Sequence, residues 1–380
     1  MSKRMKKSRP IPITRPTLEP FSAYAPLFKK TFASGMLTNG EHVREFEART
    51  AKYLGVKHCV AVSSCTAGLT LVLQGMKLKG EVILPSFTFA ASGQPILWNN
   101  LTPVFADVDA KTYTLDPESV AKTVTKKTSA ILATHVYGVP CDVGGLSRVA
   151  KKHKLKVVYD AAHAFGSTVG KRHVGSFGDA EVFSLSPIKL LTAAEGGLVA
   201  TNSDELAQHV RLGRNYGDDG TNAMQFLGLS ARMSELHAAV ALRSLAKLPQ
   251  NLKSRHAHVK YLKSALQKIE PRLEFQTIPK GSETTYYIFS IVIDPKVVGY
   301  TRDQLHDFLA KEGIGSRKYF FPPLHQQPVY KAYKPRKALP VTERVTHQVL
   351  ALPMYSHITK AELDRIIAAF RTFSSKHASV

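Results

Sequence analysis

The sequence predicts an α/β protein, with a mostly parallel central sheet in a large domain and a smaller α+β domain at the C-terminus. Two features of the 380-residue chain predict this architecture. Up to about residue 245, short runs rich in Val, Ile, Leu and Phe alternate with helical stretches, and these runs lack the polar alternation of half-exposed strands. Beyond that point the regular alternation stops, which indicates a second domain.

Seven runs in the large domain have the apolar character of strands that are buried on both faces. They are 58–64, 81–86, 102–108, 129–138, 156–162, 180–186 and 197–202. Helical stretches such as 66–78 lie between most of them. Ahead of the first strand, residues 40–54 place Val43, Phe46 and Tyr53 on one helical face. The alternation predicts parallel strands that are covered by helices.

The smaller domain is predicted to begin near Leu248-Pro249. Residues 1–248 then form the large domain, including an N-terminal arm over 1–20, and residues 249–380 form the small domain. The expected elements of the small domain are a helix over 252–266, a strand over 284–293, an irregular segment over 318–330, and two helices that begin at the capping boxes Thr301-x-x-Gln304 and Thr359-x-x-Glu362.

The composition is typical of a soluble protein from a reducing compartment. The three cysteines, Cys59, Cys65 and Cys141, cannot all pair, and a chain of this length needs no disulfide framework. The chain has no run of about 18 apolar residues, and its basic N-terminus lacks the apolar centre of a signal peptide. We therefore expect a cytoplasmic protein with no membrane partner.

The formal net charge of +23 raises the question of a nucleic-acid ligand. The basic residues are scattered over helical stretches such as 151–156 and 253–268, and the chain has neither zinc-finger spacing nor an RNA-binding pattern of aromatic residues. We therefore interpret the charge as a solvated basic surface and expect no nucleic-acid partner. Such a surface also attracts anionic substrates, for example a nucleotide diphosphate.

Polar and aromatic residues collect where the predicted strands end, which is where open α/β sheets bind ligands. The first strand ends in Ser63-Ser64-Cys65-Thr66 and runs into a helix, where free backbone N–H groups can hold a phosphate. The other residues that follow predicted strands are Phe89, Asp160, His163, Ser184 and Lys189.

Each of these residues also has an ordinary structural interpretation. Asp160 suits a helix cap or a turn, Phe89 and His163 suit the core, and a helix N-cap alone requires a run such as Ser-Ser-Cys-Thr. Together, however, they supply a phosphate cradle, an aromatic plate, a carboxylate and an amine. Those are the groups that hold pyridoxal 5′-phosphate (PLP). In that interpretation the amine of Lys189 bonds to the cofactor aldehyde, and Asp160 keeps the pyridine nitrogen protonated.

The chain resembles the fold-type I, PLP-dependent aminotransferases of the DegT/DnrJ/StrS sugar-aminotransferase family. The resemblance covers nearly the whole chain, and the spacing from Asp160 to Lys189 also matches. The motifs that carry it are GMLTNGEHVREFEARTAKYLGV (35–56), PSFTFAAS (85–92), DVDAKTYTLDP (107–117), HVYGVPCDV (135–143), YDAAHAFGS (159–167), FSLSPIKLLTAAEGG (183–197), LHQQPVY (324–330) and LALPMYSHIT (350–359).

This resemblance implies a role for each residue of the constellation. Lys189 resembles the lysine that bonds to the cofactor, and Asp160 resembles the partner of its pyridine nitrogen; these two are the expected catalytic residues. The further cofactor contacts that it implies are His163 near the ring hydroxyl, Phe89 stacked on the ring, and Cys65, Thr66 and Ser184 at the phosphate. It implies no metal site.

The resemblance also implies a homodimer. Ser230 stands where many members carry an asparagine that completes the phosphate site of the partner subunit, and a serine there has a shorter reach. His325 lies in the segment that closes over the substrate in the family and Tyr319 lies just before it, so we expect both to bind substrate. The structural alternative is a rigid proline loop, PPLHQQPVY, that packs the small domain onto the large one.

The implied activity is the transfer of an amino group from L-glutamate to a keto group of a nucleotide-linked (deoxy)sugar. Two alternatives remain open. One is amination of an unactivated cyclic ketone such as an inosose, or a related reaction of the aminohydroxybenzoate-synthase type. The other is a non-catalytic regulatory or binding protein that keeps the fold, and the complete set of lysine, aspartate and phosphate-binding residues argues against it.

Overall fold

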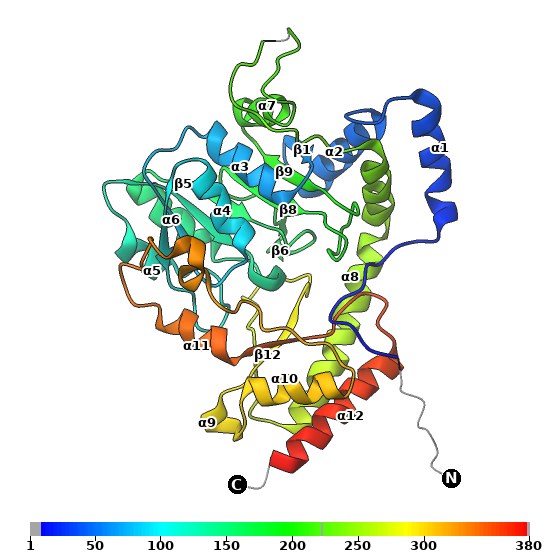
Figure 1. The fold of residues 1–380 in the computed structure, drawn as a ribbon, viewed down its shortest axis with the longest axis vertical. Coiled ribbons are helices and arrows are strands. Elements are labelled where there is room, and N and C mark those ends of the chain that lie inside the picture. Colours follow the sequence, from blue (N-terminus) through cyan, green and yellow to red (C-terminus); the bar gives the residue numbers. More distant parts are fainter. Residues whose placement is uncertain (1–8, 222, 378–380) are drawn as a thin grey trace.

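A seven-stranded sheet lies at the centre of the larger part of the molecule (Figure 1). The structure is a computed structural model that describes residues 9–221 and 223–377. The strand order is β1-β9-β8-β5-β4-β2-β3, and every neighbouring pair is parallel except the two that involve β9. The predicted mostly parallel sheet is therefore confirmed. Its strands are β1 (His58–Val62), β2 (Glu81–Pro85), β3 (Thr102–Ala106), β4 (Thr128–Thr134), β5 (Lys156–Asp160), β8 (Ala180–Ser184) and β9 (Gly197–Thr201).

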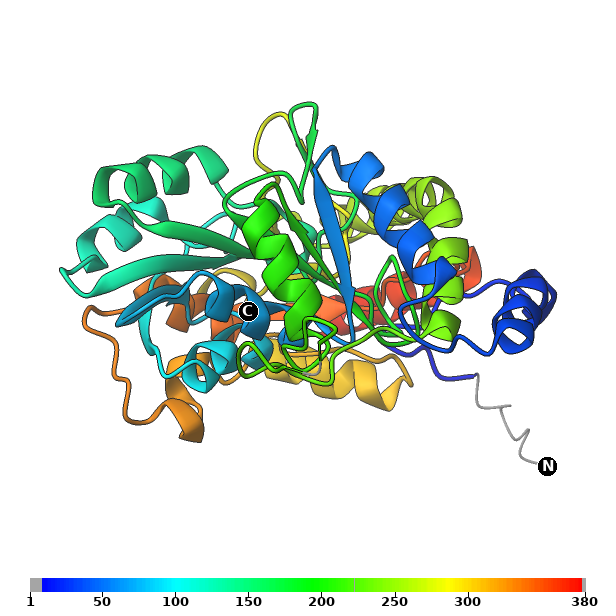
Figure 2. The same cartoon turned by 90° about the horizontal axis from the view of Figure 1, so that it is seen from above.

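Helices cover both faces of this sheet, which explains why its strands are apolar throughout (Figure 2). One face is covered by α3 (Cys65–Gly75), α4 (Ala90–Trp98) and α7 (Asp204–Gly213). The other is covered by α2 (Glu41–Leu54), α5 (Pro117–Thr123), α6 (Val143–His153) and the first half of α8 (Glu235–Ile269). Along β2, Val82 and Leu84 face α3 and α4, whereas Ile83 faces α5 and α6.

The C-terminal part has its own core around a three-stranded antiparallel sheet, as an α+β domain requires. Its strands are β10 (Glu274–Phe275), β12 (Phe289–Val292) and β13 (Val349–Leu352). Its helices are α9 (Pro295–Val298), α10 (Arg302–Lys311), α11 (Pro340–Gln348) and α12 (Lys360–His377). A small separate sheet is formed by β6 (Thr168–Val169), β7 (Arg172–His173) and β11 (Ser282–Glu283), and it joins the two parts.

Helix α8 continues without a break through the predicted domain boundary and carries Pro249 in its interior. Buried residues up to Leu248 face the core of the large domain, whereas Val259 and later ones face the core of the small domain. This one helix therefore belongs to both cores. The division near residue 248 stays a prediction.

The N-terminal arm reaches the small domain, although the prediction grouped residues 1–20 with the large one. Ile11 is buried in the small-domain core, and its backbone pairs with that of Gly313 and Gly315 after α10. The chain then passes α8 and forms α1 (Ala25–Ser34), which lies at the periphery beside that helix (Figure 1).

Two predicted strands are shorter in the structure, and the end of β4 and the residues just before β12 both line a cavity described below. The run 129–138 leaves β4 after Thr134 and forms a 3₁₀ turn in which Tyr137 has a φ of 62°. The run 284–293 is strand only over β12, because ahead of it the backbone N–H of Thr285 donates to the Ser167 hydroxyl, at 3.1 Å, instead of to a neighbouring strand. Both predicted capping boxes are confirmed by reciprocal hydrogen bonds. In the described part of the chain, no helix has both the length and the apolar composition to cross a membrane.

Candidate active site

A cavity of about 310 Å³, here called the inner cavity, opens where the parallel strands end. The parallel sheet brings these strand ends together, so residues far apart in the sequence meet there. Eight of the predicted site residues line it: Cys65, Thr66, Phe89, Asp160, His163, Ser184, Lys189 and Tyr319. The inner cavity is therefore the candidate active site.

Asp160 ends β5 and is almost fully buried at the base of the inner cavity. Its Oδ1 accepts a hydrogen bond from the Ala162 N–H at 3.0 Å, so it also has the local turn role that the sequence allowed. Its Oδ2 accepts a hydrogen bond from the hydroxyl of Ser92 in α4, at 2.5 Å. Both oxygens are thus held by donors, which fixes the orientation of the carboxylate.

Lys189 follows β8 in a turn whose backbone N–H donates to the carbonyl oxygen of Ser186 at 3.0 Å. Its Nζ lies over the ring of Tyr287, 4.2 Å from the ring centroid. Burial lowers the pKa of Lys189 from its ordinary value to about 8, and the negative charge of Asp160 works against that shift. An amine with this pKa is much more often neutral, and hence nucleophilic, near neutral pH than an ordinary lysine.

The first turn of α3 forms the opposite side of the inner cavity. Ser64 is the N-cap residue, and its hydroxyl accepts from the Ala67 N–H at 3.1 Å. The N–H groups of the first turn point out of the helix, and the side chain of Thr66 stands beside them. The thiol of Cys65 instead points toward Val182 O (3.5 Å) and Asp160, so only its backbone faces a phosphate position.

His163 combines a structural contact with a place in the inner cavity. Its Nδ1 accepts a hydrogen bond from the Tyr137 N–H at 3.2 Å, so the proton of the neutral ring is on Nε2. Its ring stacks on that of Tyr287 with centroids 4.4 Å apart. Burial, with a smaller effect of the nearby Lys189, holds the pKa of His163 well below its usual value. The imidazole is therefore a neutral hydrogen-bond donor at the cavity surface.

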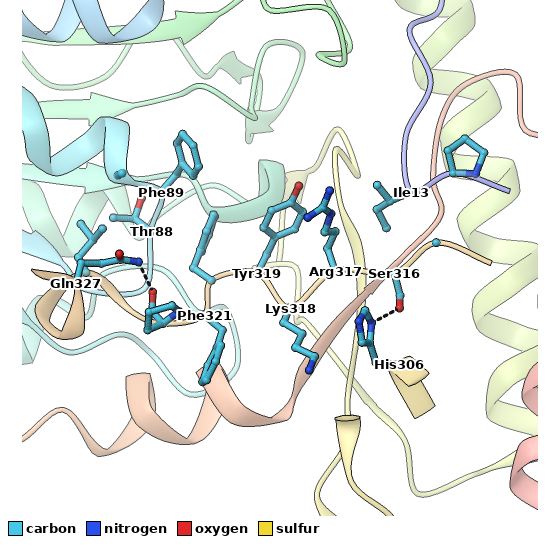
Figure 3. A pocket seen from close by; sticks show the side chains of 16 residues that line it. Ile13, Thr88, Phe89, His306, Ser316, Arg317, Lys318, Tyr319, Phe321 and Gln327 are labelled. Atoms are coloured by element: carbon cyan, nitrogen blue, oxygen red, sulfur yellow. Dashed lines mark hydrogen bonds between the residues drawn. The ribbon is translucent and has the colours of Figure 1, made fainter. Parts of the chain in front are cut away.

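Phe89 and Tyr319 connect the inner cavity to a second, outer cavity of about 790 Å³ (Figure 3). Phe89 is 58% exposed, unlike a core phenylalanine, and its ring stands free above the start of α4. The wall opposite is formed by the segment after α10, in which Arg317 and Tyr319 lie side by side while Lys318 points away from them (Figure 3). The inner cavity thus continues into a larger chamber with basic side chains.

The basic residues of the outer cavity differ in their partners. Lys318 forms a salt bridge of 2.9 Å with Asp303. His306 shares a hydrogen bond of 2.7 Å with Ser316. Within residues 9–221 and 223–377, the guanidinium group of Arg317 forms no salt bridge and no side-chain hydrogen bond, which leaves its five donors for a ligand.

Two predicted site residues line neither cavity. His325 shares a hydrogen bond of 2.7 Å with the Ser86 hydroxyl, which also accepts from the His325 N–H at 3.0 Å, so this side chain fastens the proline loop to the end of β2. Ser230 is exposed, and its backbone bridges to Asn215. The substrate role of His325 and the cofactor role of Ser230 in a partner subunit stay predictions.

Three residues that the sequence reasoning missed contribute to the site. Tyr287 was assigned to a strand, because it stands in an apolar run. Ser92 lies within the PSFTFAAS motif but in a helix, where a serine gives no signal of its own. Arg317 was one of many scattered basic residues, and only the fold reveals that it has no acidic partner in the described structure.

The inner cavity lies at the strand ends of the sheet and is surrounded by a lysine, a buried aspartate and the start of a helix. This arrangement is that of the fold-type I aminotransferase class. Comparison with known proteins agrees with this class. Residues 23–371 match the family described as the DegT/DnrJ/EryC1/StrS aminotransferase family. The chain belongs to this family, and the predicted enzyme class, an aminotransferase, is confirmed.

Two relatives illustrate the range of the family. GDP-perosamine synthase from Caulobacter vibrioides is 34% identical over 334 residues, covering 87% of this chain and 89% of that protein. The dTDP-4-amino-4,6-dideoxy-D-glucose transaminase of Escherichia coli is 31% identical over 363 residues, covering 94% of this chain and 96% of that protein.

Solved structures agree with the sequence relatives. DesI, solved in the presence of its TDP-sugar product, superposes with a TM-score of 0.92 at 36% identity, covering 97% of this chain and 94% of that one. A putative sugar aminotransferase from Streptococcus pneumoniae, in its PLP form, superposes with a TM-score of 0.89 at 26% identity, covering 97% and 99%.

Proposed function

We propose that this protein is a PLP-dependent aminotransferase that moves an amino group from L-glutamate to a keto group of a nucleotide-linked sugar. One observation carries the proposal. Lys189, Asp160 and the start of α3 surround an inner cavity that continues into a larger chamber, and this chamber contains Arg317, which has no acidic partner among the described residues. The relatives named for GDP-, dTDP- and TDP-linked sugars support the substrate class.

The residues of the inner cavity fit PLP. The free N–H groups of α3 and the hydroxyls of Thr66 and Ser184 suit its phosphate, and the Asp160 carboxylate suits its protonated pyridine nitrogen. When bound, PLP supplies an electron sink for a carbanion at the amino-bearing carbon of a substrate. Lys189 would bond to the cofactor aldehyde and, once displaced by the donor amine, take the proton from that carbon through Nζ and later return it to the acceptor.

The outer cavity supports an anionic acceptor substrate. A diphosphate bears charges that suit the free donors of Arg317, and a sugar attached to it would extend past Tyr319 and Phe89 toward Lys189. An unactivated cyclic ketone such as an inosose would leave this guanidinium group without a partner. The outer cavity therefore favours the nucleotide sugar over the cyclitol alternative.

Homodimer formation is part of the proposal. Phe21 and Phe32, before and within α1, are 71% and 67% exposed, and Leu227 near Ser230 is 89% exposed. Apolar side chains of this size at the surface favour burial against a second subunit. Mixing inactive Lys189→Ala subunits with Ser230→Trp subunits should restore activity in mixed dimers, because one of the two sites then has both groups intact. A fully active monomer in sedimentation would contradict this part.

Covalent trapping tests the role of Lys189. Borohydride reduction of the purified protein, followed by peptide mass spectrometry, should place the cofactor on Lys189, and a Lys189→Arg variant should yield no labelled peptide. Label on a different lysine would remove Lys189 from the proposal.

A substrate panel tests the acceptor. Nucleotide-linked keto sugars and free inososes are compared as acceptors, with L-glutamate and L-glutamine as donors. Arg317→Ala should raise KM for a nucleotide sugar at least about 10-fold, since it removes charge-assisted contacts of about 1.5–3 kcal/mol, while the donor half-reaction is retained. Lys318→Ala, whose ammonium is already paired with Asp303, is the matched control. Amination of an inosose at a salt-independent rate would instead support the cyclitol alternative.

A further inference from the structure

Tyr287 brings an aromatic ring from the small domain to the catalytic lysine. It precedes β12, is only 5% exposed, and lines the inner cavity. The Nζ of Lys189 is 4.2 Å from the centroid of its ring, which is well within the range of a cation–π contact. This contact is independent of any cofactor.

The ring of Tyr287 is held rigidly. The buried guanidinium group of Arg255, in α8, donates to the carbonyl oxygens of Tyr286 at 3.1 Å and Tyr287 at 3.3 Å, and to the Ser356 hydroxyl at 3.1 Å. On the side of the large domain, the ring is stacked against His163. Neither the backbone nor the ring can move without breaking these contacts, so the ring face is a fixed surface.

We propose that Tyr287 is a positioning residue, whose ring face holds the ammonium group of Lys189 in the inner cavity whenever this lysine is not bonded to the cofactor. The proposal rests on the proposed function, because it concerns the lysine that function requires. The free amine of Lys189 would thereby stay within reach of the cofactor aldehyde, instead of turning toward the outer cavity.

Few of the other groups that face Lys189 stabilise its ammonium form, so the ring of Tyr287 contributes an important part of that stabilisation. Two carboxylates line the inner cavity, Asp160 and Glu195, and the negative charge of Asp160 is the one that raises the pKa of Lys189. The Cys65 thiol, whose pKa burial raises well above its usual value, stays neutral, and so does His163. The negative face of an aromatic ring stabilises the charged amine, and thus opposes the burial that lowers the pKa of Lys189.

Removing the ring face should therefore make Lys189 lose its proton at lower pH. Cofactor-free protein is labelled with trace acetic anhydride over a pH range centred on about 8, and the acetylated fraction of the Lys189 peptide is measured by mass spectrometry. In Tyr287→Leu the pH midpoint of Lys189 acetylation should fall by about one unit, since the free energy of a desolvated cation–π contact is similar to that of a pKa shift of about one unit. In Tyr287→Phe, which keeps the ring, the midpoint should stay. Lys77, an exposed lysine, is the internal control in every sample.

Two results would overturn the proposal. Equal midpoints for Tyr287→Leu and the unaltered protein would show that the ring does not hold the ammonium. A shift in Tyr287→Phe as large as that in Tyr287→Leu would assign the effect to the hydroxyl group. If Tyr287→Leu loses its cooperative melting transition, Tyr287→Met replaces it, with a similar volume and no ring. Because the labelling uses no PLP, failure of the proposed function in the trapping experiment remains distinguishable from failure of this proposal.

Discussion

At the scale of single residues, a chain of buried hydroxyl groups fixes the Asp160 carboxylate. The hydroxyl of Ser92 donates to Asp160, and Thr88 Oγ1 lies 2.8 Å from Ser92 Oγ and 3.0 Å from Thr134 Oγ1. Each hydroxyl has one proton, and the ionised carboxylate can only accept. The hydrogen bonds therefore run from Thr134 through Thr88 and Ser92 to Asp160. This direction gives the carboxylate a single preferred orientation.

Ser92→Ala should weaken the hold on the cofactor without removing catalysis. The variant loses a hydrogen bond to a charged group, of about 1.5–3 kcal/mol, and leaves Asp160 freer to rotate. PLP affinity should fall roughly 10-fold or more by the same energy scale, as measured by titration of the cofactor-free protein. Asp160→Asn should instead lower turnover by orders of magnitude. Ser129→Ala, which removes a hydroxyl bonded to a backbone carbonyl of β2, is the control. Unchanged affinity in Ser92→Ala would refute the orienting role.

The lowered pKa of Lys189 also predicts a pH dependence of stability. The folded protein releases this proton at about pH 8, whereas the unfolded chain holds it up to the ordinary value of 10.5. The buried ammonium therefore destabilises the fold below about pH 8, and this effect disappears as the pH rises toward 10.5. In cofactor-free protein, Lys189→Met should raise the melting temperature most at neutral pH, and the gain should vanish in alkaline buffer. A gain that is constant with pH would contradict the shift.

At the scale of elements, the start of β9 touches the start of α3. A Cβ atom on Gly197 would lie 2.4 Å from the carbonyl carbon of Ser64 and 2.6 Å from the Cys65 nitrogen. Both of these are backbone atoms, which cannot give way as a flexible side chain does. The start of α3, with its free N–H groups, can therefore lie directly against the sheet because residue 197 is a glycine and has no side chain.

Gly197→Ala should displace the first turn of α3 and weaken phosphate binding. The expected result is a loss of affinity for PLP, and for inorganic phosphate as a competitor, that exceeds the loss of thermal stability. Gly144→Ala, in α6, is the matched control, because its Cβ atom would meet only side-chain atoms at 3.5 Å. If both variants bound PLP equally well, the close approach at Gly197 would have no part in the site.

The sequence predicted those features that depend on local pattern. Buried parallel strands are apolar throughout, so β2 and β5 were found, and polar residues at their ends stood out, as Asp160 did. Tyr287 could not be found in this way, because its neighbours Lys189 and His163 belong to the large domain. Arg317 could not be found either, because only the fold shows that it lines a cavity with no acidic partner among the described residues. The strand expected over 284–293 was too long for a similar reason, since the backbone N–H of Thr285 donates to Ser167 of the large domain rather than to a neighbouring strand.

At the scale of the whole molecule, the N-terminal arm and α8 both connect the two cores. Ile11 inserts into the small-domain core, where it is 1% exposed, although it is separated in sequence from the rest of that core by the entire large domain. Arg15 adds a salt bridge of 2.9 Å to Glu362 in α12. The arm is thus an integral part of the small domain.

Ile11→Ala should destabilise the small domain by about 2–5 kcal/mol, the usual range for removing most of a buried aliphatic side chain. Urea denaturation measures the change in the free energy of unfolding. Hydrogen exchange in the native protein should show the greatest loss of backbone-amide protection in β12, β13 and α12. Val297→Ala, at a position that is 45% exposed, should change little. Equal effects of the two substitutions would mean that the arm does not support this core.

The position of Ile11 sets an order of events during synthesis. The residues of the arm leave the ribosome first, but the core that receives them is complete only when α12, the last helix, has emerged. The large domain can assemble while translation continues. The arm can therefore complete its contacts only once α12 has emerged from the ribosome. A bulky fusion partner at the N-terminus would therefore interfere with the final step of maturation rather than with the first.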